Sequence, residues 1–145
     1  MNNDFRCDCP ITSALDVLGD KWMLVIVKLM LLDGKDTFKA FSESDEAVAS
    51  GILAAKLKML EKAEIISKNK LPDNKKANIY LLTEKGLALA PVIAELARWS
   101  DGYLREANPI MQNGEAMAFI RNDPKAFSNF LVSNYKEKLK KIKLA

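Results

Sequence analysis

Small and cationic side chains share one face of a helix predicted over residues 50–62. Leu53, Leu57 and Leu60 recur at helical spacing, so their side of the helix should face a core. The opposite face is small and basic, and it carries Ser50, Gly51, Ala54, Ala55, Lys58 and Lys62. A helix with such an outer face suits insertion into the major groove of DNA.

A basic hairpin is predicted directly after this helix. Residues 65–71 form a predicted strand, 72–77 a polar turn and 78–83 a returning strand. Between residues 65 and 83 there is one acid, Asp73, against four lysines, which are Lys68, Lys70, Lys75 and Lys76. The first 36 residues have the opposite balance, with four bases and six acids. The hairpin would therefore act as a wing along the neighbouring DNA backbone or minor groove.

An arm and a short helix are predicted at the start of the chain. Residues 1–10 form the arm, and Thr12 or Ser13 should cap a helix that runs through Leu18, with Leu15 and Leu18 as its buried contacts. We also expect this helix to contribute Leu15 to contacts between two copies of the chain.

The next two helices are predicted to complete the DNA-binding core. Asp20 should cap a helix over residues 21–32, whose apolar side chains nearly encircle it and so place it at the centre of the core. The first helix of the DNA-binding pair is predicted at residues 38–44, although residues 37–38 could also begin a short strand. Phe41 should be a core contact. The acids near this helix should point away from DNA, and they are Glu43, Asp45 and Glu46.

A long helix is predicted over residues 84–106, with Thr83 as its cap and Pro91 kinking or dividing it. One stripe of this helix is apolar and consists of Leu89, Ile93, Leu96, Trp99 and Tyr103. Core packing explains such a stripe, and so does a dimer contact, because aromatic side chains are enriched at interfaces. The two interpretations are compatible.

The remaining residues are predicted to form two more helices, near 115–121 and over 124–142. The basic end of the second, residues 136–143, is interpreted as a solvated helix terminus rather than a DNA contact. Residues 1–107 are expected to form a winged helix-turn-helix domain with its arm and dimerisation helices. Residues 108–145 would be a C-terminal helical extension packed on the same domain. The expected fold is mainly α with a small β-hairpin, of the α+β class.

Composition narrows the function classes. The chain has 145 residues, 49% of them hydrophobic, a net charge of +3 and a pI of about 8.8, which permits DNA binding without demanding it. It has no histidine, which excludes Ser-His-Asp and Cys-His catalysis and histidine metal sites. No cofactor is expected. The polar N-terminus is not a secretory signal and the apolar run at residues 23–32 is too short to span a bilayer, so we expect a cytoplasmic protein that does not bind membranes.

The ordered motifs resemble the HxlR-type winged helix-turn-helix transcriptional regulators of bacteria. The matching stretches are Cys9-Pro10, ALDVLGDKWMLVIVKLML, TFKAF, LAAKLKMLEKAEII, YLLTEKG and LAPVIAELARW. The resemblance implies a transcriptional regulator and not an enzyme. It implies sequence-specific binding of double-stranded DNA by a homodimer, whose recognition helices would lie about 34 Å apart on an inverted-repeat operator. It defines no small-molecule effector.

Several positions depart from the family pattern. Alanines occupy 49, 54 and 55, where such proteins usually carry hydroxyl, glutamine or arginine side chains. Alanine cannot hydrogen-bond a base edge, although its methyl group can touch thymine. Thr37 replaces a common arginine, Asn78-Ile79 replaces valine-glutamate, and a wing arginine is replaced by lysine, which binds phosphate without bidentate readout. Phosphate binding is thus retained while base readout is sparse. The alternative is a winged-helix protein-interaction module with weak or non-specific DNA binding.

Two cysteines lie in the predicted arm. Cys9 stands where some members of the family keep a redox-sensing or electrophile-sensing thiol. Arg6 would favour its thiolate and Asp8 would oppose it. Cys7 is too close for an unstrained disulfide within the arm, so a bond between subunits is the more plausible one. Cys9 is therefore either a structural residue or a sensor, and two thiols without histidine make a poor zinc site.

Overall fold

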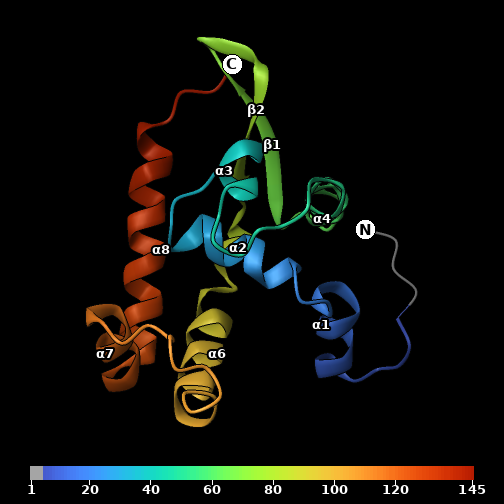
Figure 1. Cartoon of the computed structure of the whole chain (residues 1–145). Helices are drawn as coiled ribbons and strands as arrows, with labels where there is room; N and C mark the ends of the chain where they lie inside the picture. The colour runs from blue at the N-terminus through green and yellow to red at the C-terminus, as the bar shows by residue number, and fades with distance from the viewer. Residues whose placement is uncertain (1–4) are drawn as a thin grey trace. The chain divides into compact units, whose positions relative to one another are not determined.

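The computed structural model describes residues 5–145 and divides into two compact units (Figure 1). The N-terminal unit runs to Gly86 and includes Lys143–Ala145, and the C-terminal unit is Leu87–Ile142. The chain is mainly helical with a two-stranded antiparallel sheet, which confirms the predicted fold class. The units divide at Gly86 rather than at residue 107, so helix α6 (Ala90–Tyr103) groups with the C-terminal helices.

Helix α1 (Pro10–Leu18) buries none of its residues. It begins with a proline and has Cys9 as its N-cap, so the predicted cap at Thr12 or Ser13 is wrong. Proline starts a helix readily because its fixed φ suits the first turn, where an amide has no helical partner to lose. Leu15 is 56% exposed and Leu18 is only half-buried, so the predicted burial of both leucines within the chain is wrong as well.

Helix α2 (Met23–Leu31) supplies much of the core of the N-terminal unit. Its buried side chains are Met23, Ile26, Val27, Leu29, Met30 and Leu31. Asp20 accepts hydrogen bonds from the amides of Trp22 and Met23, at 2.7 and 3.0 Å. The first amides of a helix have no partner within it. Asp20 therefore holds the turn that leads into α2, but the helix begins at Met23 with Trp22 as its N-cap, so the predicted start at Lys21 with Asp20 as the cap is wrong.

Helices α3 (Phe38–Ser42) and α4 (Ser50–Lys62) form the helix-turn-helix pair. The hydroxyl oxygen of Thr37 accepts a hydrogen bond from the Ala40 amide at 3.1 Å, so this residue caps a helix and does not begin a strand. Phe41 is fully buried, as predicted. The apolar side of α4 is at most 2% exposed, at Leu53, Leu57 and Leu60. Helix α4 has the bounds that its periodicity predicted.

Strands β1 (Ile66–Leu71) and β2 (Asn74–Leu82) form the antiparallel hairpin. The turn between them is shorter than the predicted 72–77, because β2 already begins at Asn74. The Tyr80 amide donates a hydrogen bond to the Asp36 carbonyl at 2.8 Å, which ties β2 to the segment that precedes α3. The hairpin is thereby anchored to the helix-turn-helix pair.

The register of the hairpin changes near its tip. Pairing is regular from Ile66 opposite Leu82 to Asn69 opposite Ile79, and then shifts so that Leu71 pairs with Asn74. Lys70 lies at this shift and has no Cα partner in the ladder. An irregularity of this kind disrupts the ladder locally and leaves backbone groups without strand partners.

The predicted long helix after the wing is divided into α5 (Glu84–Leu87) and α6, and the break precedes Pro91. The C-terminal unit contains α6, α7 (Glu115–Asn122) and α8 (Pro124–Lys141), which pack pairwise. Its core is formed by Ile93, Ala94, Ile120, Phe127, Leu131 and Tyr135. Asp123 caps α8 by accepting a hydrogen bond from the Ala126 amide at 3.0 Å.

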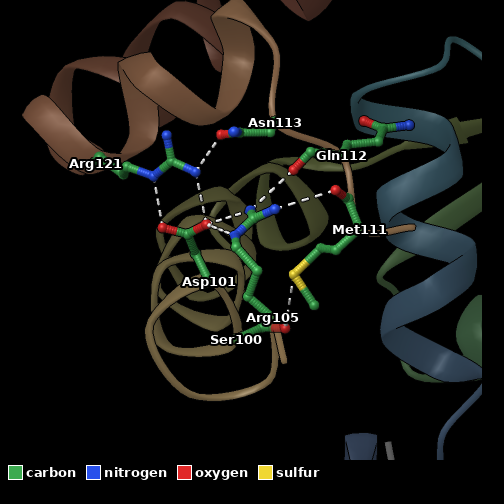
Figure 2. Close-up of polar contacts among 7 residues, drawn as sticks. All are labelled: Ser100, Asp101, Arg105, Met111, Gln112, Asn113 and Arg121. Carbon is green, nitrogen blue, oxygen red and sulfur yellow. Dashed lines mark hydrogen bonds and ion pairs between the residues drawn. The ribbon is translucent and has the colours of Figure 1, made fainter. Parts of the chain in front are cut away.

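A polar network fixes the segment between α6 and α7 (Figure 2). The Asp101 carboxylate accepts hydrogen bonds from the guanidinium groups of Arg121, at 2.6 and 2.8 Å, and of Arg105, at 3.0 Å. Arg105 also donates to the carbonyls of Met111 and Gln112, at 3.1 and 3.0 Å. The hydrogen bonds from Arg121 and Arg105 hold the pKa of Asp101 well below its ordinary value.

Candidate nucleic-acid interface

The structure exposes the whole predicted outer face of α4. The six residues of this face are all exposed, namely Ser50, Gly51, Ala54, Ala55, Lys58 and Lys62. The three leucines of the other face lie in the core. The free side of the helix therefore offers two cations, one hydroxyl and a strip with little side-chain bulk, which is a surface that a groove can accept.

A hollow of about 650 Å³ lies where α4 meets the hairpin. It is lined by Phe38, Ala54, Leu57, Lys58, Glu61, Lys62, Lys68 and Tyr80. Lys58 and Lys62 come from α4 and Lys68 from β1, so helix and wing contribute cations to one concave surface. Among the described residues, none of these three lysines forms an ion pair with a carboxylate. Their charges are available to an external anion.

One lysine of α4 forms a contact within the chain that its sequence position did not predict. Lys56 forms an ion pair with Asp20 at 2.7 Å and so joins α4 to the turn before α2. Partial burial raises the pKa of Asp20, but the hydrogen bonds from Lys56 and from the amides of Trp22 and Met23 outweigh it, and the pKa is lowered. The contact spans 36 positions of sequence, which local periodicity cannot reveal.

The four wing lysines are not equivalent. Lys68, Lys75 and Lys76 are exposed, whereas Lys70 is half-buried. The ammonium group of Lys70 lies 3.5 Å from the carbonyl oxygen of Lys76, so its side chain reaches across to β2. Three of the four predicted wing contacts are therefore presented freely to solvent.

The acids near α3 are partly neutralised within the chain. Glu46 forms an ion pair with Lys28 of α2. Partial burial raises the pKa of Glu46, but the hydrogen bond from Lys28 and other hydrogen bonds outweigh it, and the pKa is lowered. Glu43, the C-cap of α3, lies 4.0 Å from Lys39 of that helix. These pairings reduce the repulsion that free carboxylates would exert on phosphate.

The TEKG segment clamps the wing to the end of α4. The Thr83 hydroxyl lies 2.6 Å from the Glu64 carbonyl and accepts a hydrogen bond from the Gly86 amide at 3.1 Å. The Lys85 ammonium group donates to the Ala63 carbonyl at 2.8 Å. A Cβ atom on Gly86 would lie 2.3 Å from the carbonyl oxygen of Ile65, so only glycine fits there. This motif fixes the hairpin relative to the recognition helix.

Cys9 occupies a position that favours its thiolate. Hydrogen bonds from the amide and hydroxyl of Thr12 and from the Ile11 amide lower the pKa of the Cys9 thiol. Both cysteines are free thiols, Cys7 exposed and Cys9 half-buried. The sequence suggested Arg6 as the activating group, but Arg6 is paired with Asp16 at 2.6 Å. The start of α1 therefore lowers this pKa, and that signal was available in the Cys-Pro helix start.

The predicted dimer contacts are mostly exposed. Trp99 and Tyr103 are 57% and 77% exposed, and their rings lie 5.8 Å apart. Leu96 and Leu15 are about half exposed, at 49% and 56%. Ile93 is buried in the C-terminal unit and acts there as a core residue. The stripe on α6 thus begins in the core and ends as an uncovered aromatic surface.

Among residues 5–145, no group of three or more histidine, cysteine, aspartate or glutamate side chains could hold a metal ion. Over the same range, no helix is both long and apolar enough to cross a bilayer.

Comparison with known proteins agrees with the architecture. The family described as HxlR-like helix-turn-helix matches residues 17–108. The HTH-type transcriptional regulator YodB of Bacillus subtilis is 35% identical over 105 residues, which cover 72% of this chain and 93% of YodB. The family match ends at residue 108, before α7, so α7 and α8 lie outside the family region.

Solved structures show the same fold. The reduced form of YodB gives a TM-score of 0.55 at 37% identity and covers 67% of this chain and 95% of that chain. The structure of PA1607 gives a TM-score of 0.64 at 29% identity, over 75% of this chain and 73% of that one. The redox regulator HypR, in its oxidized form, gives 0.56 at 28% identity, over 65% and 96%.

Proposed function

We propose a mode of operator binding for this chain, which belongs to the HxlR-like helix-turn-helix family of transcriptional regulators. Helix α4 enters the major groove, and the wing follows the adjacent backbone or minor groove. The observation that carries this proposal is the hollow between helix and hairpin, where Lys58, Lys62 and Lys68 outnumber one acid, Glu61, and form no ion pair with it. A DNA duplex supplies phosphates to helix and wing at once.

Phosphate contacts dominate this mode of binding. The exposed face of α4 has methyl groups at Ala54 and Ala55, where a side chain with donors or acceptors would read base edges. Lys58 is the polar side chain best placed for the groove. Affinity should therefore depend steeply on salt, and the preference for an operator over random DNA should be modest. If the chain shows no preference for any DNA sequence, it has the alternative function of an interaction module with non-specific DNA binding.

The regulator acts as a homodimer in this proposal. Support comes from the exposed aromatic surface of α6, where Leu96, Trp99 and Tyr103 form an apolar stripe, and from the exposed Leu15 on α1. Burial of such side chains stabilises association, and tryptophan and tyrosine are frequent interface hot spots. Two half-sites in an inverted repeat follow from the two-fold symmetry of a dimer.

Selection of genomic fragments by the purified protein tests the proposal directly. Enriched fragments should share an inverted repeat with half-sites about one helical turn apart. Enrichment without any shared sequence would contradict sequence-specific binding and favour the alternative, an interaction module with non-specific DNA binding. The selected fragment then becomes the operator probe for measurements on variants.

Two lysine variants separate phosphate binding from groove contacts. Replacing Lys75 and Lys76 with alanine should weaken binding to operator and random DNA alike and lower the salt slope by up to about two. Lys58→Ala should reduce operator affinity more than affinity for random DNA. Equal losses on both DNAs for Lys58→Ala would place its ammonium group on a phosphate.

Thiol chemistry at Cys9 is a second proposal, and its support is independent of the lysines. YodB has been solved bound to a quinone and after diamide treatment, and HypR is a redox regulator. In this chain the Cys9 thiolate, favoured by the start of α1, would add to a quinone ring, form a carbon–sulfur bond and leave the ring as a hydroquinone after proton uptake. The adduct on α1 would alter how two subunits meet.

Operator affinity before and after quinone treatment tests this step. The parent protein and Cys7→Ser should lose affinity on treatment, whereas Cys9→Ser should keep it. If Cys9→Ser responds as the parent does, Cys9 has a structural role only.

A further inference from the structure

The last residues of the chain return to the wing. Lys143–Ala145 belong to the same compact unit as the hairpin. The Ala145 amide donates a hydrogen bond to the Lys70 carbonyl at 2.9 Å. In Figure 1 the C-terminal end lies beside the β1–β2 hairpin. The sequence predicts a solvated helix end at residues 136–143 and carries no signal of a contact between the tail and the wing.

The register of the hairpin explains why the tail meets Lys70. This residue has no partner in the ladder, because the pairing shifts between Asn69 and Leu71. A backbone carbonyl without a strand partner needs another donor. The Ala145 amide is that donor, and the tail uses a position that the β1–β2 pairing leaves open.

The tail brings a further lysine to a surface that already carries several. Lys143 is exposed and lies two positions from the residue that bonds to β1. Lys75 and Lys76 are exposed on the neighbouring strand. Within the described chain, none of these three lysines forms an ion pair with an acid. Like charges repel, so gathering them here is unfavourable until a polyanion neutralises them.

We propose that Lys143–Ala145 is a third DNA-contacting element, beside α4 and the wing. The hydrogen bond to Lys70 holds the tail on β1, and Lys143 binds a backbone phosphate next to those bound by the wing. This inference rests on the proposed function. It assigns to the tail a contact that carries no base readout, because lysine binds phosphate as a point charge. The tail therefore extends the footprint of each subunit along the backbone.

The salt dependence of binding to a mixed-sequence DNA duplex tests the assignment with the full chain. Loss of one phosphate contact lowers the slope of log affinity against log salt by about 0.9. Lys143→Met should show this decrease, and Lys143→Arg, which keeps the charge, should not. Ala145→Pro removes the amide donor and should lower the slope in the same direction.

Lys75→Met is the internal reference that separates this inference from the proposed function. If Lys75→Met lowers the slope and Lys143→Met leaves it unchanged, the tail is not a DNA contact, while the wing still is. If neither variant changes the slope, the proposed mode of binding is itself wrong. An unchanged slope for Ala145→Pro would show that the hydrogen bond to Lys70 does not position Lys143.

Discussion

In the N-terminal unit the residues left exposed on α4 and the wing are lysines and small side chains, whereas α6 of the C-terminal unit exposes Leu96, Trp99 and Tyr103. The first surface attracts polyanions, and salt screens that attraction. The second gains stability by burying apolar area, which salt does not screen. DNA affinity and self-association should therefore respond to different residues and different conditions.

The largest effect should come from the three lysines around the hollow. Replacing Lys58, Lys62 and Lys68 with methionine removes two phosphate contacts and the groove contact of Lys58. The salt slope should fall by at least about 1.8 and the affinity by about 100-fold near physiological salt. Titration of labelled DNA at several salt concentrations measures both quantities. The dimer dissociation constant from sedimentation should stay unchanged, and a parallel change would mean that the two surfaces are not separate.

The second effect concerns association alone. Trp99→Ala combined with Tyr103→Ala should raise the dimer dissociation constant by at least about 30-fold, because buried aromatic hot spots contribute about 2 kcal/mol or more. Ile110→Ala is the control, since Ile110 is 89% exposed but lies outside α6. Sedimentation at low and high salt should give the same ratio. If the dimer dissociation constant is unchanged by both aromatic substitutions, α6 is not part of the interface.

Alanine substitution of one glycine in each unit should change the free energy of unfolding in opposite directions. Gly86→Ala should lower the free energy of unfolding by about 1–3 kcal/mol, because the added Cβ atom would lie 2.3 Å from the Ile65 carbonyl oxygen. Gly102→Ala should raise it by about 0.5–1 kcal/mol, because Gly102 is helical and a Cβ atom meets nothing within 4 Å. Denaturant unfolding measures both, and equal effects would contradict the clamp at Gly86.

The smallest effect is a pH dependence. The pKa of Asp101 is depressed in the folded chain, so the stability it contributes is present above its ordinary value of 3.8 and is lost as the pH falls through the folded value. Asp101→Asn should therefore be less stable than the parent near neutral pH, and the difference should narrow below pH about 4. Unfolding curves across this range test it, and a constant difference would show that the carboxylate charge is unimportant.

Local patterns predicted much of the N-terminal unit. The leucine spacing predicted α4, and Thr83 acts as the cap that its residue type suggested. Residues that act through distant partners were missed or misread. Lys56 shares its helix with Lys58 but reaches Asp20, and Arg6 is held by Asp16 rather than by Cys9. Periodicity assigns a side chain to a face, and it does not identify the partner that lies opposite.

The C-terminal unit was predicted less completely. Pro91 and the Asp123 cap allowed the helices to be predicted. The sequence did not show which residues of the α6 stripe are buried and which are exposed. A regular apolar spacing is the same whether a helix packs within its own chain or against another. The return of Ala145 to Lys70 joins residues 75 positions apart and has no local signal at all.

The clamp between TEKG and the end of α4 has a consequence for how the wing can vary. Contacts from Thr83 and Lys85 to residues 63–65 close the hairpin at its base, so the tip is a tethered loop whose ends are already fixed. Lengthening such a loop costs only about 0.6 kcal/mol for each doubling. Insertions in the turn at residues 72–73, or exchanged charges on the strand ends beside it, can therefore be tolerated without displacing α4. The tip is the part of this regulator where evolution or engineering can retune the footprint while the recognition helix keeps its place.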